Sequence, residues 1–331
     1  MKVTIIGTKK DGEEFEIQVS TRIRTLDLFH CQLTDIDLSP LRECTKLQEL
    51  NFDLNHFTSL DLSPLSNCKK FRFLDLKNNQ IESIDLSPLS ECPGLKEICF
   101  ANNKLSQIDL SALSGLKKLF SIALDGNLLS SIDLSPLSGC EGLLELFLAN
   151  NQLTKIDLSP LENCKNLERL DLTNTNISTI DLSPLKGHQI LQYFSAKNNQ
   201  LTSIDFSSLS ECKELLWIDI YNNEITSLDL TPLSKCKKLE IINLDANQLS
   251  TIDLSPLSTC KSLLEISILN NRLESVDLSP LIHCQKLEAV ILEKDQKITW
   301  QSNELDLEKL PIGLQHFSKE IVQAWQEYMK L

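Results

Sequence analysis

The chain has 331 residues, of which 41% are apolar, and its 46 acidic and 32 basic side chains give a formal net charge of −14. This length suits two or three ordinary domains or one long repeat array. The acidic excess repels phosphate, and no apolar run approaches the roughly 18 residues of a spanning helix, so we expect no nucleic-acid and no membrane partner. The first apolar run is shorter than the roughly 7–15 residues of a signal peptide, so we expect a soluble, cytoplasmic protein.

Residues 1–22 are expected to form a hairpin. The segments VTIIG and EFEIQV flank the sequence KKDG, in which Asp11 and Gly12 are favourable turn residues. A repeat array follows, and such an array exposes its core at both ends. We therefore expect this hairpin to cap the first repeat.

Residues 23–298 repeat a 24-residue pattern without insertion, which we divide into twelve units. The skeleton reads LxxLxLxxNxLxxIDLSPLSxC, and the unit that begins at Phe71 reads FRFLDLKNNQIESIDLSPLSECPG. The aspartate of the (I/L/V)DL tripeptide recurs every 24 residues, at Asp37, Asp61, Asp85, Asp109, Asp133, Asp157, Asp181, Asp205, Asp229, Asp253 and Asp277.

This pattern resembles the leucine-rich repeat family in its intracellular short-repeat form. The resemblance implies an α/β solenoid, with a curved parallel sheet on the concave side and short helical or 3₁₀ turns on the convex side. Leu74 and Leu76 alternate as in a short half-buried strand. A buried amide column follows, able to satisfy backbone groups of its own unit and the next, and weakened where Thr175 replaces asparagine. This structural ladder comprises Asn55, Asn79, Asn103, Asn127, Asn151, Asn199, Asn223, Asn247 and Asn271.

The Ser-Pro segment after each strand predicts a short helical turn, with Ser87 as N-cap and Pro88 as the first helical residue. The stacked aspartates before these segments repel one another unless each is satisfied. Each carboxylate could accept bonds from N–H groups of the turn, or the column could hold divalent cations. One carboxylate per unit supplies too few of the about six to eight oxygens that calcium needs, which favours the structural role.

Cysteine fills a third column in nine units: Cys44, Cys68, Cys92, Cys140, Cys164, Cys212, Cys236, Cys260 and Cys284. Leu116 and His188 hold this position elsewhere, so we interpret it as a core position with buried thiols and a tolerated histidine. The sequence lacks closely spaced ligand sets such as CxxC, and we expect no metal site. Disulfides between adjacent units are the alternative, although cysteine-rich caps, usual in extracellular members of the family, are missing from 1–22 and 299–331.

Residues 299–331 leave the repeat register after a five-residue insertion. Leu314, Phe317, Ile321, Ala324 and Tyr328 then recur at helical spacing, which predicts an amphipathic helix. We expect it to close the last repeat, and partner docking on this helix is the alternative. Histidines are scattered, and the motifs GxxxxGK[ST], GxGxxG and HExxH are absent. Only His30 and His56, near Asp27 and Asp53, suggest an enzyme, so we expect neither catalysis nor a cofactor.

The concave face carries the candidate binding residues. Positions two, four and six before the ladder asparagine point outward from the strands, and aromatic side chains gather there in units eight to ten. Exposed aromatic side chains commonly anchor partners, with strand propensity as the competing explanation. The predicted partner-binding residues are Tyr193, Trp217, Tyr221, Ile241 and Phe147, with Asp219, Asp245 and Lys197 as a charged rim.

The resemblance implies a protein-interaction module, and we therefore expect a non-catalytic scaffold or regulator that binds its partner on the concave face and acts as a monomer. By resemblance alone, its partners would be regulators of GTPases, phosphatases or ubiquitin-type enzymes. A ligand-recognition or effector module of a host–microbe or signalling system is the alternative, and an enzyme is a distant one.

Overall fold

The computed structural model describes residues 1–303 and 305–330 and divides into two compact units, 1–167 and 168–331. The first unit holds β1 (Lys2–Lys9), β2 (Glu14–Ser20), β3 (Thr25–Asp27), β4 (Leu33–Ile36), β5 (Glu49–Asn51), β6 (Phe73–Asp75), β7 (Glu97–Cys99), β8 (Ser121–Ala123) and β9 (Glu145–Phe147). The second holds β10 (Arg169–Asp171), β11 (Tyr193–Ser195), β12 (Trp217–Asp219), β13 (Ile241–Asn243), β14 (Glu265–Ser267), β15 (Val276–Asp277), β16 (Ala289–Ile291), β17 (Ile298–Thr299), α1 (Ile312–Gln315) and α2 (Ser318–Tyr328).

Short 3₁₀ helices follow the strands. In the first unit they are η1 (Ser39–Glu43), η2 (Ser63–Asn67), η3 (Ser87–Glu91), η4 (Ser111–Leu113), η5 (Ser135–Gly139) and η6 (Ser159–Asn163). In the second they are η7 (Ser183–Leu185), η8 (Ser207–Glu211), η9 (Thr231–Lys235), η10 (Ser255–Thr259), η11 (Ser279–His283) and η12 (Leu307–Lys309). No helix of the described residues is long and apolar enough to cross a bilayer.

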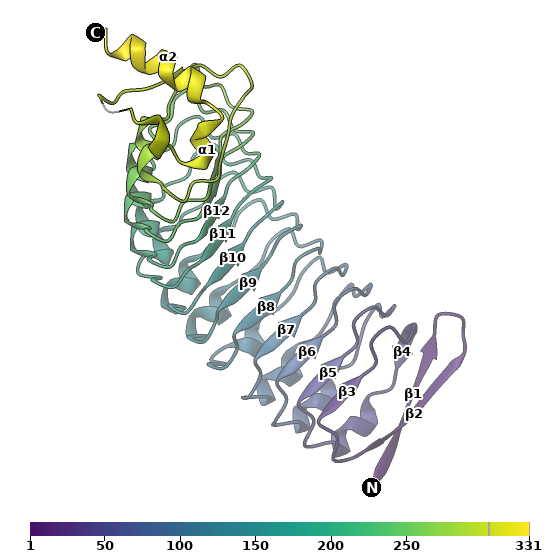
Figure 1. The fold of residues 1–331 in the computed structure, drawn as a ribbon. Helices are drawn as coiled ribbons and strands as arrows, with labels where there is room; N and C mark the ends of the chain where they lie inside the picture. The colour runs from purple at the N-terminus through teal and green to yellow at the C-terminus, as the bar shows by residue number, and fades with distance from the viewer. Residues whose placement is uncertain (304, 331) are drawn as a thin grey trace. The chain divides into compact units, whose positions relative to one another are not determined.

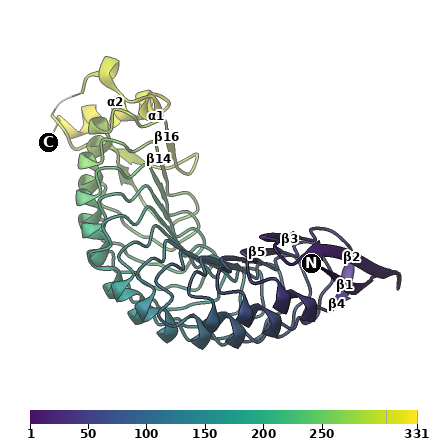
Figure 2. The same ribbon diagram turned by 90° about the horizontal axis from the view of Figure 1, so that it is seen from below.

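The predicted solenoid class is confirmed. Within the first unit β3 and β5–β9 pair in parallel in chain order, and within the second β10–β14 and β16 do the same. Each pairing joins residues 24 apart, as where Leu50 lies opposite Leu74. In both units the 3₁₀ helices form a row on the side opposite these strands (Figures 1 and 2). A constant repeat length therefore puts equivalent residues side by side.

The core of each repeat lies between its strand and its 3₁₀ helix. Leu74 at the centre of β6 is 1% exposed, and Leu76 and Leu89 are fully buried. The flanking strand residues Phe73 and Asp75 stay partly exposed, because successive side chains of a strand point to opposite faces. We call the face that carries them the strand face.

The ladder asparagines link each repeat to the one before it. The Asn79 amide nitrogen donates to the Phe52 carbonyl at 2.9 Å, and its Oδ1 accepts from the Phe57 N–H at 3.1 Å. The same amide donates to the Leu76 carbonyl of its own repeat at 3.1 Å. The sequence analysis predicted that each ladder asparagine would bond to the following repeat, and this direction is wrong. The loop whose N–H and carbonyl groups the asparagine satisfies belongs to the preceding repeat.

Thr175 occupies a ladder position with a shorter side chain. Its hydroxyl lies 3.0 Å from the Leu172 carbonyl of its own repeat and 3.0 Å from Asn199 Oδ1. Asn199 Oδ1 also accepts from the N–H groups of Thr175 and Ile177, each at 3.1 Å. The bond from the Ile177 N–H is the ordinary ladder bond of Asn199, whereas the bonds of Thr175 run to its own repeat and to Asn199 and not back to the preceding loop.

A second asparagine column, which the sequence analysis missed, precedes the ladder. Its members adopt the left-handed conformation with φ near 55°, which asparagine tolerates better than most residues. Asn102 donates to Asn78 Oδ1 at 2.9 Å, and Asn222 donates to Asn198 Oδ1 at 3.0 Å. The Asn-Asn dipeptide of the repeat was the available signal. The column comprises Asn78, Asn102, Asn150, Asn174, Asn198, Asn222 and Asn270.

The aspartate column caps the 3₁₀ helices, which confirms the structural interpretation. Asp85 Oδ1 accepts from the Ser87 N–H at 2.8 Å, and Oδ2 accepts from the Ser87 hydroxyl at 2.9 Å. The prediction of Ser87 as N-cap is therefore wrong. Leu86 holds the N-cap position, its side chain cannot accept a hydrogen bond, and Pro88 is the second helical residue.

These caps predict acid sensitivity. The Ser159 N–H, followed by the Ser159 hydroxyl, holds the pKa of Asp157 below its ordinary value. A lowered folded-state pKa means that the cap stabilises the fold above the ordinary aspartate pKa of about 4, and that this contribution disappears as the pH falls through the folded value. We expect Asp157→Ala to lower the Tm at neutral pH.

Asp157→Asn is the matched control, because its amide oxygen still accepts from the Ser159 N–H (2.8 Å in the wild type) but carries no charge. The Tm of Asp157→Asn should stay close to that of the wild type at neutral pH. On acidification its Tm should fall less than that of the wild type. Melting curves across this pH range test both variants. Equal melting of Asp157→Ala and wild type at every pH would show that the cap is dispensable.

The cysteine column is buried, as predicted, and all eleven cysteines of the chain are free thiols. Cys92 Sγ lies 3.5 Å from the Leu65 carbonyl of the preceding 3₁₀ helix, which also accepts from the Cys68 N–H at 2.8 Å. The thiol is thus a weak donor to a buried carbonyl as well as a small apolar group. At the same repeat position, Leu116 is 7% exposed and His188 is fully buried.

Both ends of the chain depart from the repeat. β1 pairs antiparallel with β2, and its other edge pairs antiparallel with β4. At the C-terminal end β17 pairs with β15, and α2 buries Ile321 and Ala324. Trp300, which follows β17, is only 1% exposed. The helix predicted from apolar spacing is present in two pieces, with Leu314 in α1 and Ile321, Ala324 and Tyr328 in α2.

Candidate partner-binding surface

The aromatic and branched residues predicted to bind a partner lie together on the strand face of residues 168–331. Tyr193 on β11, Trp217 on β12 and Ile241 on β13 are direct neighbours in the parallel register. Tyr221 follows the end of β12. Trp217 and Tyr221 are each 37% exposed, whereas Tyr193 and Ile241 are half-buried. We call these four residues the aromatic patch.

The centre of the aromatic patch is a stack of three side chains. The Tyr193 and Trp217 ring centroids are 6.1 Å apart with an interplanar angle of 45°. The Arg169 guanidinium carbon lies 5.3 Å from the Tyr193 centroid, within the range of a cation–π contact. Burial, followed by the Asp171 charge, raises the pKa of Tyr193. The stack holds both rings in place while Trp217 keeps 37% of its surface exposed.

A groove of about 180 Å³ opens beside this stack. Its lining residues are Arg169, Gln192, Tyr193, Leu216, Trp217 and Glu240. The groove combines two aromatic walls with one positive and one negative side chain, a composition suited to a protein side chain that is both apolar and polar. It is too small for a drug-sized ligand.

Four groove residues were missed by the sequence analysis. Arg169 stands in the same column as Tyr193, one repeat earlier, and the column itself was the signal. Gln192, Leu216 and Glu240 lie just before their strands, where the repeat gives no rule for side-chain direction.

The predicted charged rim is wrong for Asp219, which is 4% exposed. Its carboxylate accepts from the Tyr221 N–H at 3.1 Å and lies 3.4 Å from the Lys197 ammonium. Burial raises the pKa of Asp219, and the Tyr221 N–H and Lys197 act in the opposite direction. Asp219 therefore supports the backbone under Tyr221 and holds Lys197 in place.

Asp245 is also engaged in internal hydrogen bonds. Its Oδ1 accepts from the Ser267 hydroxyl and from the Leu269 N–H, both at 2.6 Å. Phe147 belongs to the first unit, at the end of β9, and is half-buried. Of the predicted charges, Lys197 is the one that presents a substantially exposed side chain, at 37%.

The histidines and aspartates at the start of the array are held by separate local contacts. His56 Nε2 lies 3.0 Å from Gln32 Oε1. Asp27 accepts from the Phe29 N–H, and Asp53 accepts from the Asn78 amide. Among residues 1–303 and 305–330, no three His, Cys, Asp or Glu side chains are arranged to hold a metal ion.

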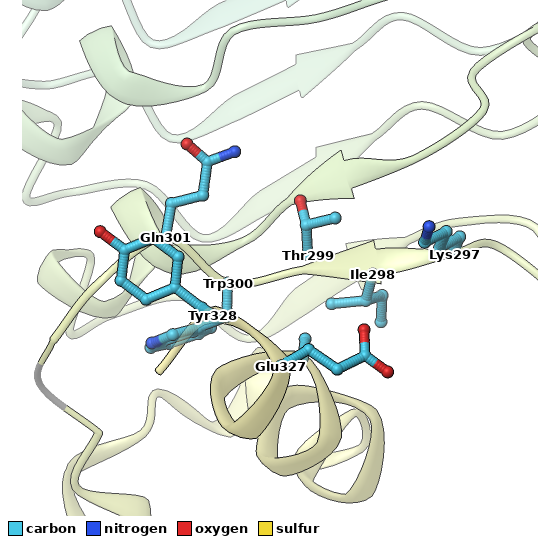
Figure 3. A pocket seen from close by; sticks show the side chains of 8 residues that line it. Lys297, Ile298, Thr299, Trp300, Gln301, Glu327 and Tyr328 are labelled. Atoms are coloured by element: carbon cyan, nitrogen blue, oxygen red, sulfur yellow. The ribbon is translucent and has the colours of Figure 1, made fainter. Parts of the chain in front are cut away.

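A larger cavity of about 540 Å³ lies at the C-terminal end, between β17 and α2 (Figure 3). Thr299, Trp300 and Gln301 line it from the strand side, and Glu327 and Tyr328 line it from the helix. None of the predicted binding residues contributes to it. This cavity is a gap between the last strand and the closing helix.

Three family models match the chain. They describe a leucine rich repeat at 72–129, leucine rich repeats in two copies at 141–187, and a BspA type leucine rich repeat region in six copies at 186–303. No curated protein sequence matches the chain significantly.

Among solved structures, the internalin InlF of Listeria monocytogenes is 29% identical, with a TM-score of 0.71 over 86% of this chain and 78% of InlF. Internalin C2 of the same organism is 30% identical, with a TM-score of 0.52 over 62% of this chain and 83% of internalin C2. L. monocytogenes InlJ, whose functional domain includes a cysteine ladder, is 22% identical, with a TM-score of 0.59 over 89% of this chain and 68% of InlJ, and shows the fold alone.

Proposed function

Because this chain belongs to the leucine-rich repeat family, whose members are generally non-catalytic binding modules, we propose that it binds a partner protein through the aromatic patch. One observation carries the proposal. Trp217 is 37% exposed on the strand face, stacked against Tyr193 beside a groove, and fills no core. Exposed rings held rigid in this way lose little entropy on binding and are frequent interface anchors.

The charges around the patch support a protein rather than a small ligand. The groove is small, at about 180 Å³, whereas the patch extends over three neighbouring strands. Arg169, Lys197 and Glu240 supply both signs of charge beside the rings. Such a surface combines an apolar centre with a polar margin, as protein interfaces do.

The test uses the full chain as bait in lysate of its source cells, followed by affinity measurements with the purified partner. Trp217→Ala should weaken binding at least about tenfold, because truncation of a central aromatic anchor has this effect. Its Tm should stay close to that of the wild type. Trp217→Phe keeps a ring and should recover part of the affinity.

Leu128→Ala is the matched control. Leu128 is 45% exposed in the first unit and lies outside the strands. If this substitution weakens binding as much as Trp217→Ala does, or if Trp217→Ala leaves binding unchanged, the aromatic patch is not the interface.

The same proposal includes a cytoplasmic monomer that acts as a scaffold or regulator. Eleven free cysteines are typical of a reducing compartment, which supports this location. The likeness to internalins favours a second candidate, a ligand-recognition or effector module. Fractionation of source cells distinguishes the two, because the second predicts the protein outside the cell that makes it.

A further inference from the structure

A strongly basic groove lies in the first unit, beside the starts of its strands. Its volume is about 630 Å³, and the side chains that define it come from the segments that lead into the strands. Five of them are cationic, although the whole chain has a net charge of −14. These residues are Lys69, Lys70, Arg72, Lys96 and Lys118, and with Gly94 they form what we call the basic groove.

The repeat stacks these cations in register. The Arg72 N–H donates to the Gln48 carbonyl at 2.7 Å, and the Lys96 N–H donates to the Arg72 carbonyl at 2.8 Å. Neighbouring repeats are therefore separated by about 4.8 Å, the spacing of hydrogen-bonded strands. Lys70 and Lys118 are two repeats apart, or about 10 Å, with Gly94 between them.

Gly94 leaves the floor of the basic groove open. A Cβ built at this position would lie 3.4 Å from the Phe71 carbonyl oxygen, an ordinary contact. The backbone therefore does not require glycine here. Glycine at this position leaves the space between Lys70 and Lys118 free of a side chain.

Part of the positive charge lacks an internal partner. Lys69 forms an ion pair with Glu91, and the Lys96 ammonium lies 5.8 Å from the Phe73 ring centroid. Lys70, Arg72 and Lys118 are exposed, and none of them forms an ion pair within the described residues 1–303 and 305–330. Three cations within about 10 Å repel one another, which an anionic ligand would relieve.

The repeat itself does not demand this charge. In residues 168–331 the position of Lys70 is held by Ile190, Glu214, Lys238, Ser262 and Lys286, so a cation is optional there. Lys238 is neutralised by an ion pair with Glu214. Both units fold with the same strands and 3₁₀ helices, so the clustering of cations in the first unit has no role in forming the repeat.

We propose that the basic groove docks an acidic, extended segment of a protein. Alternate side chains of an extended segment are about 6.7 Å apart, so its carboxylates can reach cations on successive repeats. Arg72 offers the planar fork that pairs with two carboxylate oxygens. A nucleic acid fits less well, because its backbone is charged at every nucleotide and would pass Glu49 and Glu97 on the adjoining strands, whereas a peptide carries acidic side chains only where its sequence places them. The basic groove shares no residue with the aromatic patch.

The experiment uses the full chain and a fluorescent glutamate-rich peptide, with its all-glutamine counterpart as the neutral probe. The groove variant is Lys70→Glu/Arg72→Glu/Lys118→Glu. The control variant, Lys155→Glu/Lys213→Glu/Lys286→Glu, changes three exposed lysines elsewhere and gives the same net charge. The acidic peptide should bind the wild type, release at high salt, and bind the groove variant at least about tenfold more weakly. The control variant and Trp217→Ala should bind it as the wild type does.

Four results would overturn the proposal. The first is that the acidic peptide does not bind the wild type, and the second is that the glutamine peptide binds it equally well. The third is that the control variant loses as much affinity for the acidic peptide as the groove variant does. The fourth is that inorganic phosphate or single-stranded DNA displaces the acidic peptide at a lower concentration than unlabelled peptide does. If the groove variant melts earlier than the wild type, Lys70→Gln/Arg72→Gln/Lys118→Gln replaces it, with the same expected loss.

Discussion

Replacement of Asn103 by alanine should lower the free energy of unfolding by about 2–3 kcal/mol, which makes it one of the most damaging single changes outside the apolar core. Asn103 is 7% exposed. Its Oδ1 accepts from the Ile81 N–H at 2.9 Å, and its amide nitrogen donates to the Leu76 and Phe100 carbonyls at 2.9 and 3.0 Å.

The loss falls unevenly on these three groups. The Leu76 carbonyl also accepts from Asn79, and the Phe100 carbonyl also accepts from Asn127, so each keeps one donor. The Ile81 N–H has no second acceptor among the hydrogen bonds of the described residues, and Ile81 is fully buried. An unsatisfied buried donor accounts for most of the expected cost.

Asn102→Gly is the matched control for Asn103→Ala. Asn102 is exposed and has a φ of 55°, and Gly126 already holds the equivalent position of the next repeat with a φ of 67°. Urea unfolding should show a change within about 0.5 kcal/mol for this control. Amide exchange of Ile81 should accelerate in Asn103→Ala alone. Equal stabilities of the two variants would show that the ladder bonds contribute little.

Thiol labelling of the native protein should be fast at Cys31 and slower by a factor of about 10² to 10³ or more at the cysteine column. Burial raises the pKa of Cys68 and Cys236 to about 12, and that of Cys164 to about 11. Only the thiolate reacts, so a higher pKa removes the reactive form, and burial also blocks the reagent. Cys31 is only partly buried, although burial raises its pKa as well.

Mass spectrometry after short labelling measures this difference, and Cys31→Ser should remove the fast phase. In urea all eleven cysteines should react. Cys99, on the strand face at 9% exposure, tests the reasoning further, because burial raises its pKa to about 12 and it should remain slow. Fast labelling of several column cysteines in the native state would contradict the buried column.

The sequence predicted most of the fold because the repeat length is constant. Residues 24 apart become neighbours in a parallel register, so each column of the sequence is a row in the structure. Burial of leucine, cysteine and asparagine columns could therefore be read from residue type alone. Exposure of Trp217 followed from the alternation of strand side chains.

Contacts between different columns could not be read in this way. The Asn79 amide reaches back to Phe52 and Phe57, and the Asp85 carboxylate caps the turn in place of Ser87, because these bonds depend on loop conformation. Periodicity determines which residues lie on the same face of the solenoid. It does not determine the conformation of a loop or the rotamer of a side chain.

The two candidate surfaces show the same division. The sequence by itself determined that Tyr193 and Trp217 stand side by side on an exposed face, because both lie on the repeat register. Only the tertiary structure decided that Asp219 is buried, that Arg169 stacks on Tyr193, and that Lys70, Arg72 and Lys118 surround one groove. The physical reason is that the contacts of long side chains depend on their length, their rotamer and the cost of removing them from water. A 24-residue period specifies none of these for side chains of different columns.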